Sequence, residues 1–292
     1  DFAAVGRTGK LGMMAYHLWL AGYPLEHSLS PQIHAAALAA LQLAGDYQLF
    51  ALPYAAELAG VCQRLRTGEL HGLNVTIPYK QVIIPLLDHL APNAQLCGAV
   101  NTLVVQAGAL VGENTDLPGF LNDLQASLGP LSAGRAVVLG AGGAARAVVA
   151  GLLSSGWHVS ICARRVAQAE ELAASLGSHF APASLSVVEA ASFNKLQAAV
   201  QQAGLLVNTT PVGMYPQVQA DPLPQAIKLP ASLAVYDLIY NPLQTRLLQR
   251  AAHNGCRSAY GLGMLVEQAA LAFECWLGVP APRAAMRAAV QA

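Results

Sequence analysis

Short apolar runs alternate with segments of helical periodicity through the first part of the chain. The runs that we expect to form strands cover residues 16–21, 47–52, 72–77, 99–105 and 110–111. The segments of helical periodicity cover residues 33–43, 55–66 and 79–87, and Ser30 before Pro31 is expected as the N-cap of the first. Because strands that alternate with helices form βαβ units, this pattern predicts a largely parallel sheet.

A second series of alternating elements begins near residue 119. Strands are expected at residues 136–139, 158–162, 205–208 and 234–238, and helices at 120–128, 144–155, 167–176, 243–254 and 264–277. Residues 180–197 have weak periodicity and give no clear element. Two such series within 292 residues predict an α/β protein with two domains.

The composition argues against several classes of protein. Hydrophobic residues make up 54% of the chain and charged residues 11%, which is the reverse of a disordered sequence. Sixteen basic side chains balance sixteen acidic ones, so no bulk field attracts nucleic acid or an anionic membrane. The longest weakly polar stretch, residues 147–163, is interrupted by glycine, serine and histidine and is shorter than a spanning helix requires. We therefore expect neither a nucleic-acid partner nor a membrane partner.

Cysteine usage and the chain start give three further expectations. The five cysteines form an odd set without C-x-x-C spacing, and the histidines show no ligand spacing, so neither a disulfide framework nor a metal site is expected. No secretory signal pattern is present, which favours a cytoplasmic protein. Residues 1–12 lack apolar periodicity and are interpreted as a leader, left from expression or disordered. Monomer and homodimer both stay open.

A glycine-rich turn follows the expected strand at residues 136–139. The turn and the start of the next helix read Gly140-Ala141-Gly142-Gly143-Ala144-Ala145. Gly140 allows the tight turn, Gly142 allows close approach of a pyrophosphate, and Ala145 allows close packing of helix on sheet. Such a turn can also serve the backbone alone, but a strand before it and a helix after it favour dinucleotide binding.

The residues after the next expected strand bear on the choice of cofactor. NAD sites usually place an acid there to hold the ribose 2′-hydroxyl, whereas this chain has Ala163-Arg164-Arg165. A guanidinium pairs with a 2′-phosphate, so the sequence favours NADP over NAD. The alternative is that the two arginines only decorate a solvated helix start, where cations are mildly unfavourable.

Polar motifs in apolar surroundings occupy the first hundred residues and recur late in the chain. They cover residues 22–31, 74–80, 98–103, 112–116, 208–214, 236–242 and 261–269. Together with the glycine turn, they resemble the shikimate dehydrogenase family, which reduces 3-dehydroshikimate with NADPH in aromatic amino acid biosynthesis. The resemblance runs from about Tyr16 to the C-terminus.

The resemblance implies roles for particular residues. Lys80 and Asp116 correspond to the catalytic pair. The substrate ligands would be Ser28, Ser30, Thr76, Asn101, Tyr240 and Gln268. The cofactor would be held by the turn from Gly140 to Ala144 and by Arg164, Arg165, Leu238 and Gly261, the last two near the nicotinamide. This chain departs from the family pattern at Ala163, Arg165 and Gln168, where the family usually has Asn, Thr and a basic residue.

The resemblance also implies the order of the domains. Residues 13–117 are expected as an α/β substrate-binding and catalytic domain, and residues 118–255 as a Rossmann-type NADP-binding domain. Residues 256–292 are expected as C-terminal helices that return to the substrate domain.

The chemistry of ketone reduction suits the Lys80–Asp116 assignment. An ammonium can stabilise a developing alkoxide and donate its proton, whereas a guanidinium hardly ever deprotonates. Lys80 is one of four lysines against twelve arginines, and a neighbouring carboxylate would orient it. Without the motif context, an ordinary surface ion pair would be the simpler interpretation.

Two alternatives stay open at this point. One is a quinate/shikimate dehydrogenase of broader specificity that also uses NAD, against which the missing acid at residues 163–165 counts. The other is a non-catalytic relative that senses the metabolite, which loss of the lysine or the aspartate would favour. Both Lys80 and Asp116 are present.

Overall fold

The computed structural model describes residues 15–291, so the expected leader at residues 1–12 lies outside the described residues. Within them the chain divides into two compact units. The first unit comprises residues up to 95, residues 99–115 and the chain from residue 266 onward. The second comprises residues 96–98 and 116–265. No helix of the described residues is long and apolar enough to cross a membrane.

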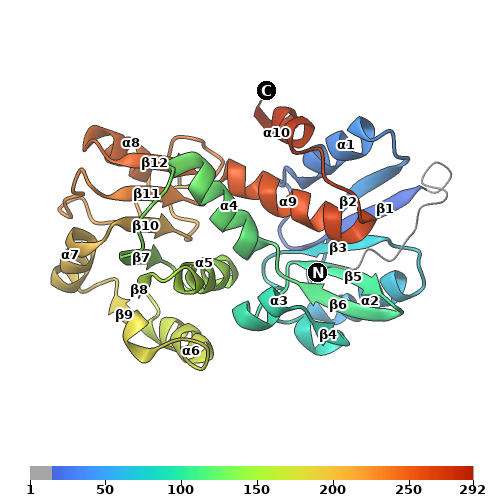
Figure 1. Cartoon of the computed structure of the whole chain (residues 1–292), viewed down its shortest axis with the longest axis horizontal. Coiled ribbons are helices and arrows are strands. Elements are labelled where there is room, and N and C mark those ends of the chain that lie inside the picture. The colour runs from blue at the N-terminus through green and yellow to red at the C-terminus, as the bar shows by residue number, and fades with distance from the viewer. Residues whose placement is uncertain (1–14, 292) are drawn as a thin grey trace. The chain divides into compact units, whose positions relative to one another are not determined.

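The first unit is built on a mixed six-stranded sheet in the order β2-β1-β3-β5-β6-β4 (Figure 1). Its strands are β1 (Tyr16–Gly22), β2 (Gly45–Ala51), β3 (Gly72–Val75), β4 (His89–Leu90), β5 (Thr102–Gln106) and β6 (Ala109–Glu113). Both neighbours of β5 run antiparallel to it, and the other pairs are parallel. The C-terminal ends of β1 and β3 and the N-terminal end of β5 therefore share one edge of the sheet.

The helices of this unit cover an apolar core that extends from β1 and β3 to β5 and β6. They include α1 (Ser30–Ala40), α2 (Leu58–Arg66), α3 (Pro92–Cys97), the later turns of α9 (Leu262–Leu277) and α10 (Arg283–Gln291). Helix α10 packs against α1, so the C-terminal helices return to this unit. Leu58, Leu65, Leu73 and Leu103 are among the buried side chains of the core.

Two expectations about this unit are wrong in detail. The helix expected at residues 79–87 is absent, and turns with one short 3₁₀ segment, Ile84–Leu86, replace it. Pro85 lacks the backbone N–H that a continuous helix would use there. Ser30 is the first residue of α1 rather than its N-cap, which is Leu29, and the Ser28 side chain accepts the Ser30 N–H at 3.3 Å.

The second unit has an all-parallel sheet in the order β12-β11-β10-β7-β8-β9 (Figure 1). Its strands are β7 (Arg135–Leu139), β8 (His158–Ala163), β9 (Leu185–Glu189), β10 (Leu205–Asn208), β11 (Ala234–Asp237) and β12 (Arg257–Tyr260). Its helices include α4 (Asp116–Leu128), α5 (Gly143–Ser154), α6 (Val166–Gly177), α7 (Phe193–Gln202) and α8 (Arg246–His253). This is the doubly wound Rossmann order, which reverses between β7 and β10.

Three elements of the second unit were not expected. Strand β9 and helix α7 fall largely in the stretch of weak periodicity, and their exposed positions explain the weak pattern. Strand β12 was assigned to the C-terminal helices at residues 256–292, but it pairs in parallel with β11. Only Ala259 of its four residues is buried, so the strand lacks an apolar run in the sequence.

Candidate active site

The glycine turn lies at the point where the order of the second sheet reverses. Gly140 follows β7 with a φ of +108°, a conformation that side chains rarely adopt. A Cβ on Gly140 would also lie 2.6 Å from the Thr209 hydroxyl oxygen. Its N–H donates to the Cys162 carbonyl at 2.8 Å, which ties the turn to β8. The backbone conformation and the packing of the turn therefore require glycine at position 140, independently of any cofactor.

Gly142 has a different environment. It is the N-cap residue of α5, and a Cβ added to it would meet nothing within 4 Å. The Arg146 backbone N–H donates to its carbonyl at 3.1 Å, so the N–H groups of residues 143–145 precede the first helical hydrogen bond and are open to an anion. Ala145 is completely buried against the sheet. An open helix N-terminus beside a glycine that packing does not require fits a diphosphate group.

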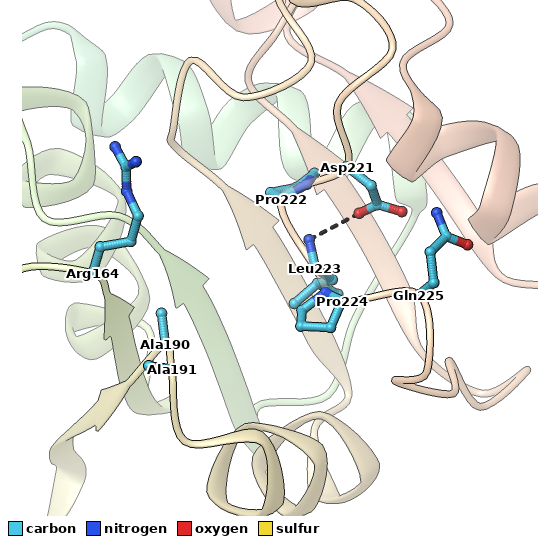
Figure 2. A pocket seen from close by; sticks show the side chains of 8 residues that line it. All are labelled: Arg164, Ala190, Ala191, Asp221, Pro222, Leu223, Pro224 and Gln225. Carbon is cyan, nitrogen blue, oxygen red and sulfur yellow. Dashed lines mark hydrogen bonds between the residues drawn. The ribbon is translucent and has the colours of Figure 1, made fainter.

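Arg164 lines a pocket of about 620 Å³ at the carboxyl ends of β8 and β9. Figure 2 shows Arg164 near Ala190 and Ala191, with the segment from Asp221 to Gln225 across the pocket. The Asp221 carboxylate is paired with Arg250 at 2.9 Å and accepts the Leu223 N–H, so its charge is compensated. The pocket therefore offers an exposed guanidinium where a 2′-phosphate is expected.

Arg165 does not share this position. It is the N-cap residue of α6, exposed, and is not among the residues that line the pocket. The structure thus separates two arginines that were both expected to hold the cofactor. Arg164 fits a phosphate-binding role, while the described contacts give Arg165 no such place.

The segments after β10 and β11 are joined by a buried polar network that the sequence did not assign. Asn208 donates to Asp237 at 2.9 Å, and the Thr245 hydroxyl donates to the other carboxylate oxygen at 2.7 Å. The Ile239 N–H donates to Asp237 as well, while burial raises the pKa of this carboxyl to about 6. The signal for this network in the sequence is that the apolar strands β10 and β11 each end in a polar residue.

This network fixes the backbone that carries Leu238 and Tyr240. Gly261 donates its N–H to the Ile239 carbonyl at 3.1 Å, and a Cβ on it would lie 1.9 Å from the Leu238 carbonyl oxygen. Gly261 is thus required for packing against Leu238, whatever it does for a cofactor. Tyr240 is half-buried, and burial raises the pKa of its phenol.

In the first unit, the segments that carry Ser28, Thr76, Lys80 and Asn101 meet at one edge of the sheet. A Cβ on Gly22, which leads into the serine loop, would collide with the Thr76 methyl group. The Thr76 N–H donates to the Ala21 carbonyl, and the Val100 N–H donates to the Lys80 carbonyl at 2.7 Å. Thr76 and Lys80 are half-buried. The structure therefore brings these motifs together.

The Asn101 side chain is held within a buried cluster. Its oxygen accepts the Thr115 N–H at 2.8 Å and the Thr102 hydroxyl at 3.1 Å. Its nitrogen donates to the Thr115 hydroxyl at 2.9 Å and to Gln268 Oε1 at 3.3 Å. Because a backbone donor occupies the oxygen, the amide nitrogen directs one N–H to the Thr115 hydroxyl and the other to Gln268. Two of the expected substrate ligands are thereby in contact.

The two residues expected as the catalytic pair belong to different units. Lys80 belongs to the first, and Asp116, which is buried, is the first residue of α4 in the second. Asp116 directly follows Thr115, whose backbone and hydroxyl bind Asn101. Among residues 15–291, no group of three His, Cys, Asp or Glu side chains could hold a metal ion.

The second unit has the Rossmann strand order and the glycine turn, and the first unit holds the polar cluster around Asn101. These features define a two-unit dinucleotide-binding α/β protein. Residues 20–103 match the family model of the shikimate dehydrogenase substrate binding domain, and residues 261–291 match that of the shikimate 5′-dehydrogenase C-terminal domain. The NADP⁺ shikimate dehydrogenase of Symbiobacterium thermophilum is 44% identical over 94% of this chain and 93% of its own. The chain belongs to the shikimate dehydrogenase family.

Solved structures support the same relationship. Shikimate 5-dehydrogenase from Thermus thermophilus, in complex with NADP(H) and shikimate, is 38% identical with a TM-score of 0.83. The alignment covers 94% of this chain and 98% of that one. Quinate dehydrogenase from Corynebacterium glutamicum, in complex with NAD, is 30% identical with a TM-score of 0.87, covering 95% of this chain and 99% of that one.

Proposed function

We propose that this chain is an NADP-dependent oxidoreductase that interconverts 3-dehydroshikimate and shikimate in aromatic amino acid biosynthesis. The observation that carries the proposal is the 44% identity over 94% of the chain to an NADP⁺ shikimate dehydrogenase. The open turn at Gly142 and the Arg164 pocket support a 2′-phosphorylated dinucleotide. The first unit is proposed as the substrate domain and the second as the NADP-binding domain.

The chain's own residues would bind and orient the substrate. Ser28 and Ser30 offer hydroxyl donors for its carboxylate, and Ser30 stands at the start of α1. The Asn101 N–H that donates to Gln268 would bind a substrate oxygen in its place, with Gln268 beside it. Thr76 and Tyr240 complete the proposed substrate ligands. Hydrogen bonds of this kind fix which carbonyl carbon meets the cofactor.

Lys80 is proposed as the proton donor and Asp116 as the carboxylate that orients it. The dinucleotide, when bound, supplies the hydride to the carbonyl carbon. The Lys80 ammonium stabilises the negative charge that develops on the carbonyl oxygen and transfers one proton to it, giving the secondary alcohol. In the reverse direction the neutral amine accepts the hydroxyl proton. The balance is one hydride and one proton per ketone.

The remaining assignments belong to the same proposal. Five free cysteines, four of them buried, fit a protein that works in the reducing cytoplasm. Quinate oxidation with NAD is the second candidate activity, because a quinate dehydrogenase bound to NAD has a TM-score of 0.87 to this chain. The absence of an acid at residues 163–165 counts against a preference for NAD.

The proposed function predicts the outcome of four assays on the purified chain. Shikimate and quinate are each mixed with NADP⁺ or NAD⁺, and nicotinamide absorbance is followed. Turnover is expected mainly with shikimate and NADP⁺. Comparable turnover with quinate and NAD⁺ would replace the first candidate by the second. Shikimate binding without turnover in any assay would indicate a non-catalytic sensor instead.

Arg164→Ala is expected to raise the KM for NADP⁺ by at least about tenfold and to leave the KM for NAD⁺ within about twofold. The reason is that the guanidinium is proposed to pair with the 2′-phosphate, which NAD⁺ lacks. Arg165→Ala is the matched control, because this exposed neighbour does not line the pocket. Equal losses for both cofactors in Arg164→Ala would contradict the assignment.

A further inference from the structure

We propose that Tyr47 is a positioning residue for the substrate site, acting through a buried hydrogen-bond relay that runs from Tyr47 through Asn74 and Thr102 to Asn101. The inference deepens the proposed function and rests on it, since Asn101 is a proposed substrate ligand. Tyr47 lies on β2, outside the motifs that resemble the family. Asn74 lies on β3, within the motif at residues 74–80, and connects Tyr47 to it.

The relay starts at the phenol of Tyr47. This hydroxyl donates its proton to Asn74 Oδ1 at 2.8 Å. Tyr47 and Asn74 are both buried, and burial raises the pKa of the phenol, so it stays a neutral donor. The amide of Asn74 is thereby fixed with its oxygen toward Tyr47 and its nitrogen toward β5.

The second half of the relay runs from Asn74 to Asn101. Asn74 Nδ2 donates to the Asn101 backbone carbonyl and to the Thr102 hydroxyl, both at 3.0 Å. The Thr102 hydroxyl, which accepts that bond, donates its proton to Asn101 Oδ1 at 3.1 Å. The Tyr47 donor thus sets the direction of the bonds as far as the Thr102 hydroxyl, which joins the Thr115 N–H as a second donor to Asn101 Oδ1. The result is an Asn101 amide with one N–H on the Thr115 hydroxyl and the other directed at Gln268.

Aromatic side chains pack against the ring of Tyr47 and hold its phenol in place. The His34 ring stacks on it at a centroid distance of 4.3 Å and an interplanar angle of 6°. The Trp276 ring contacts both His34 and Tyr47, and its indole N–H donates to the Leu103 carbonyl at 2.9 Å. Tyr47→Phe would keep this stack and remove only the hydroxyl. Tyr47→Phe therefore tests the hydrogen-bond relay without changing the aromatic packing.

The test measures shikimate binding and turnover in single and double variants. Tyr47→Phe is expected to raise the shikimate Kd and KM by about fivefold, with kcat and the NADP⁺ KM within about twofold of wild type. Thr102→Val, which keeps the side-chain shape and removes the hydroxyl that orients Asn101, is expected to have the same effect. Tyr236→Phe is the control, because it removes another buried phenol, one that donates to Asp123 in the other unit. Its shikimate KM should not change.

A double-mutant cycle separates positioning from a general loss of stability. In the Asn101→Ala background, Tyr47→Phe should change the shikimate Kd by less than about twofold, because the group it orients is gone. Additive losses, or an unchanged Kd in both Tyr47→Phe and Thr102→Val, would overturn the relay. Kd is measured by calorimetry without turnover, so wild-type protein that binds shikimate but fails to oxidise it would refute the proposed function and leave the relay test intact. Wild-type protein that does not bind shikimate would overturn both.

Discussion

Lys80→Met is expected to lower kcat for shikimate oxidation by about 10³-fold while changing the shikimate KM by less than about fivefold. The side chain keeps its length and loses the ammonium. Proton transfer and charge stabilisation at the reacting oxygen operate in the transition state, so their loss affects turnover more than ground-state binding. The measurement is steady-state kinetics with saturating NADP⁺.

Two further variants define what Lys80 contributes. Lys80→Arg keeps a positive charge that hardly ever deprotonates, so it should recover charge stabilisation without proton transfer and remain at least about 10²-fold below wild type. Lys195→Met, on the exposed face of α7, is the control and should turn over normally. A Lys80→Met enzyme with near-normal kcat would refute the assignment.

The sequence predicted the parts of the fold that depend on local pattern. The apolar strand β7, the glycine turn and the apolar face of α5 were correctly placed because each is encoded within about twenty residues. Strand β12 was missed because its pairing with β11 stabilises it, rather than a local apolar run. The apolar periodicity of residues 79–87 predicted a helix that does not form, because Pro85 lacks the backbone N–H that a continuous helix would use.

In the candidate site, too, some features follow from the local sequence and others depend on long-range contacts. Arg164 and Arg165 were both expected to hold the cofactor, and only Arg164 lines the pocket. Tyr47 carried no functional signal because its role depends on Asn74, a residue 27 positions away that the sheet brings to its hydroxyl. Long-range hydrogen bonds of this kind are set by strand register, which one sequence does not specify.

His34 lies on α1 and is completely buried, with neither ring nitrogen hydrogen-bonded among the described residues. Burial lowers the pKa of His34 from 6.5 to about 3. Between these values the unfolded chain binds a proton that the folded chain does not. The free energy of unfolding therefore falls as the pH drops below 6.5, by about 1.4 kcal/mol per pH unit from this group.

Asp237 opposes this effect in the wild-type protein. Burial raises the pKa of its carboxyl to about 6 from 3.8, so the folded chain binds the extra proton between those values. Its contribution to stability is present at low pH and is lost as the pH rises through 6. Over the range from about pH 6 to pH 4 the two groups largely cancel, so the wild-type stability curve alone does not reveal either of them.

His34→Phe is therefore expected to stabilise the protein relative to wild type by an amount that grows as the pH falls. The phenyl ring keeps the stack on Tyr47 and has no nitrogen to protonate. The difference in unfolding free energy should increase by about 1.4 kcal/mol per pH unit, or about 3 kcal/mol between pH 6.5 and pH 4.5. Urea unfolding at several pH values measures it, with His253→Gln at an exposed position of α8 as the control. Parallel pH curves for wild type and His34→Phe would show that His34 is protonated equally in the folded and unfolded states, since only a difference in proton binding gives the curves different slopes.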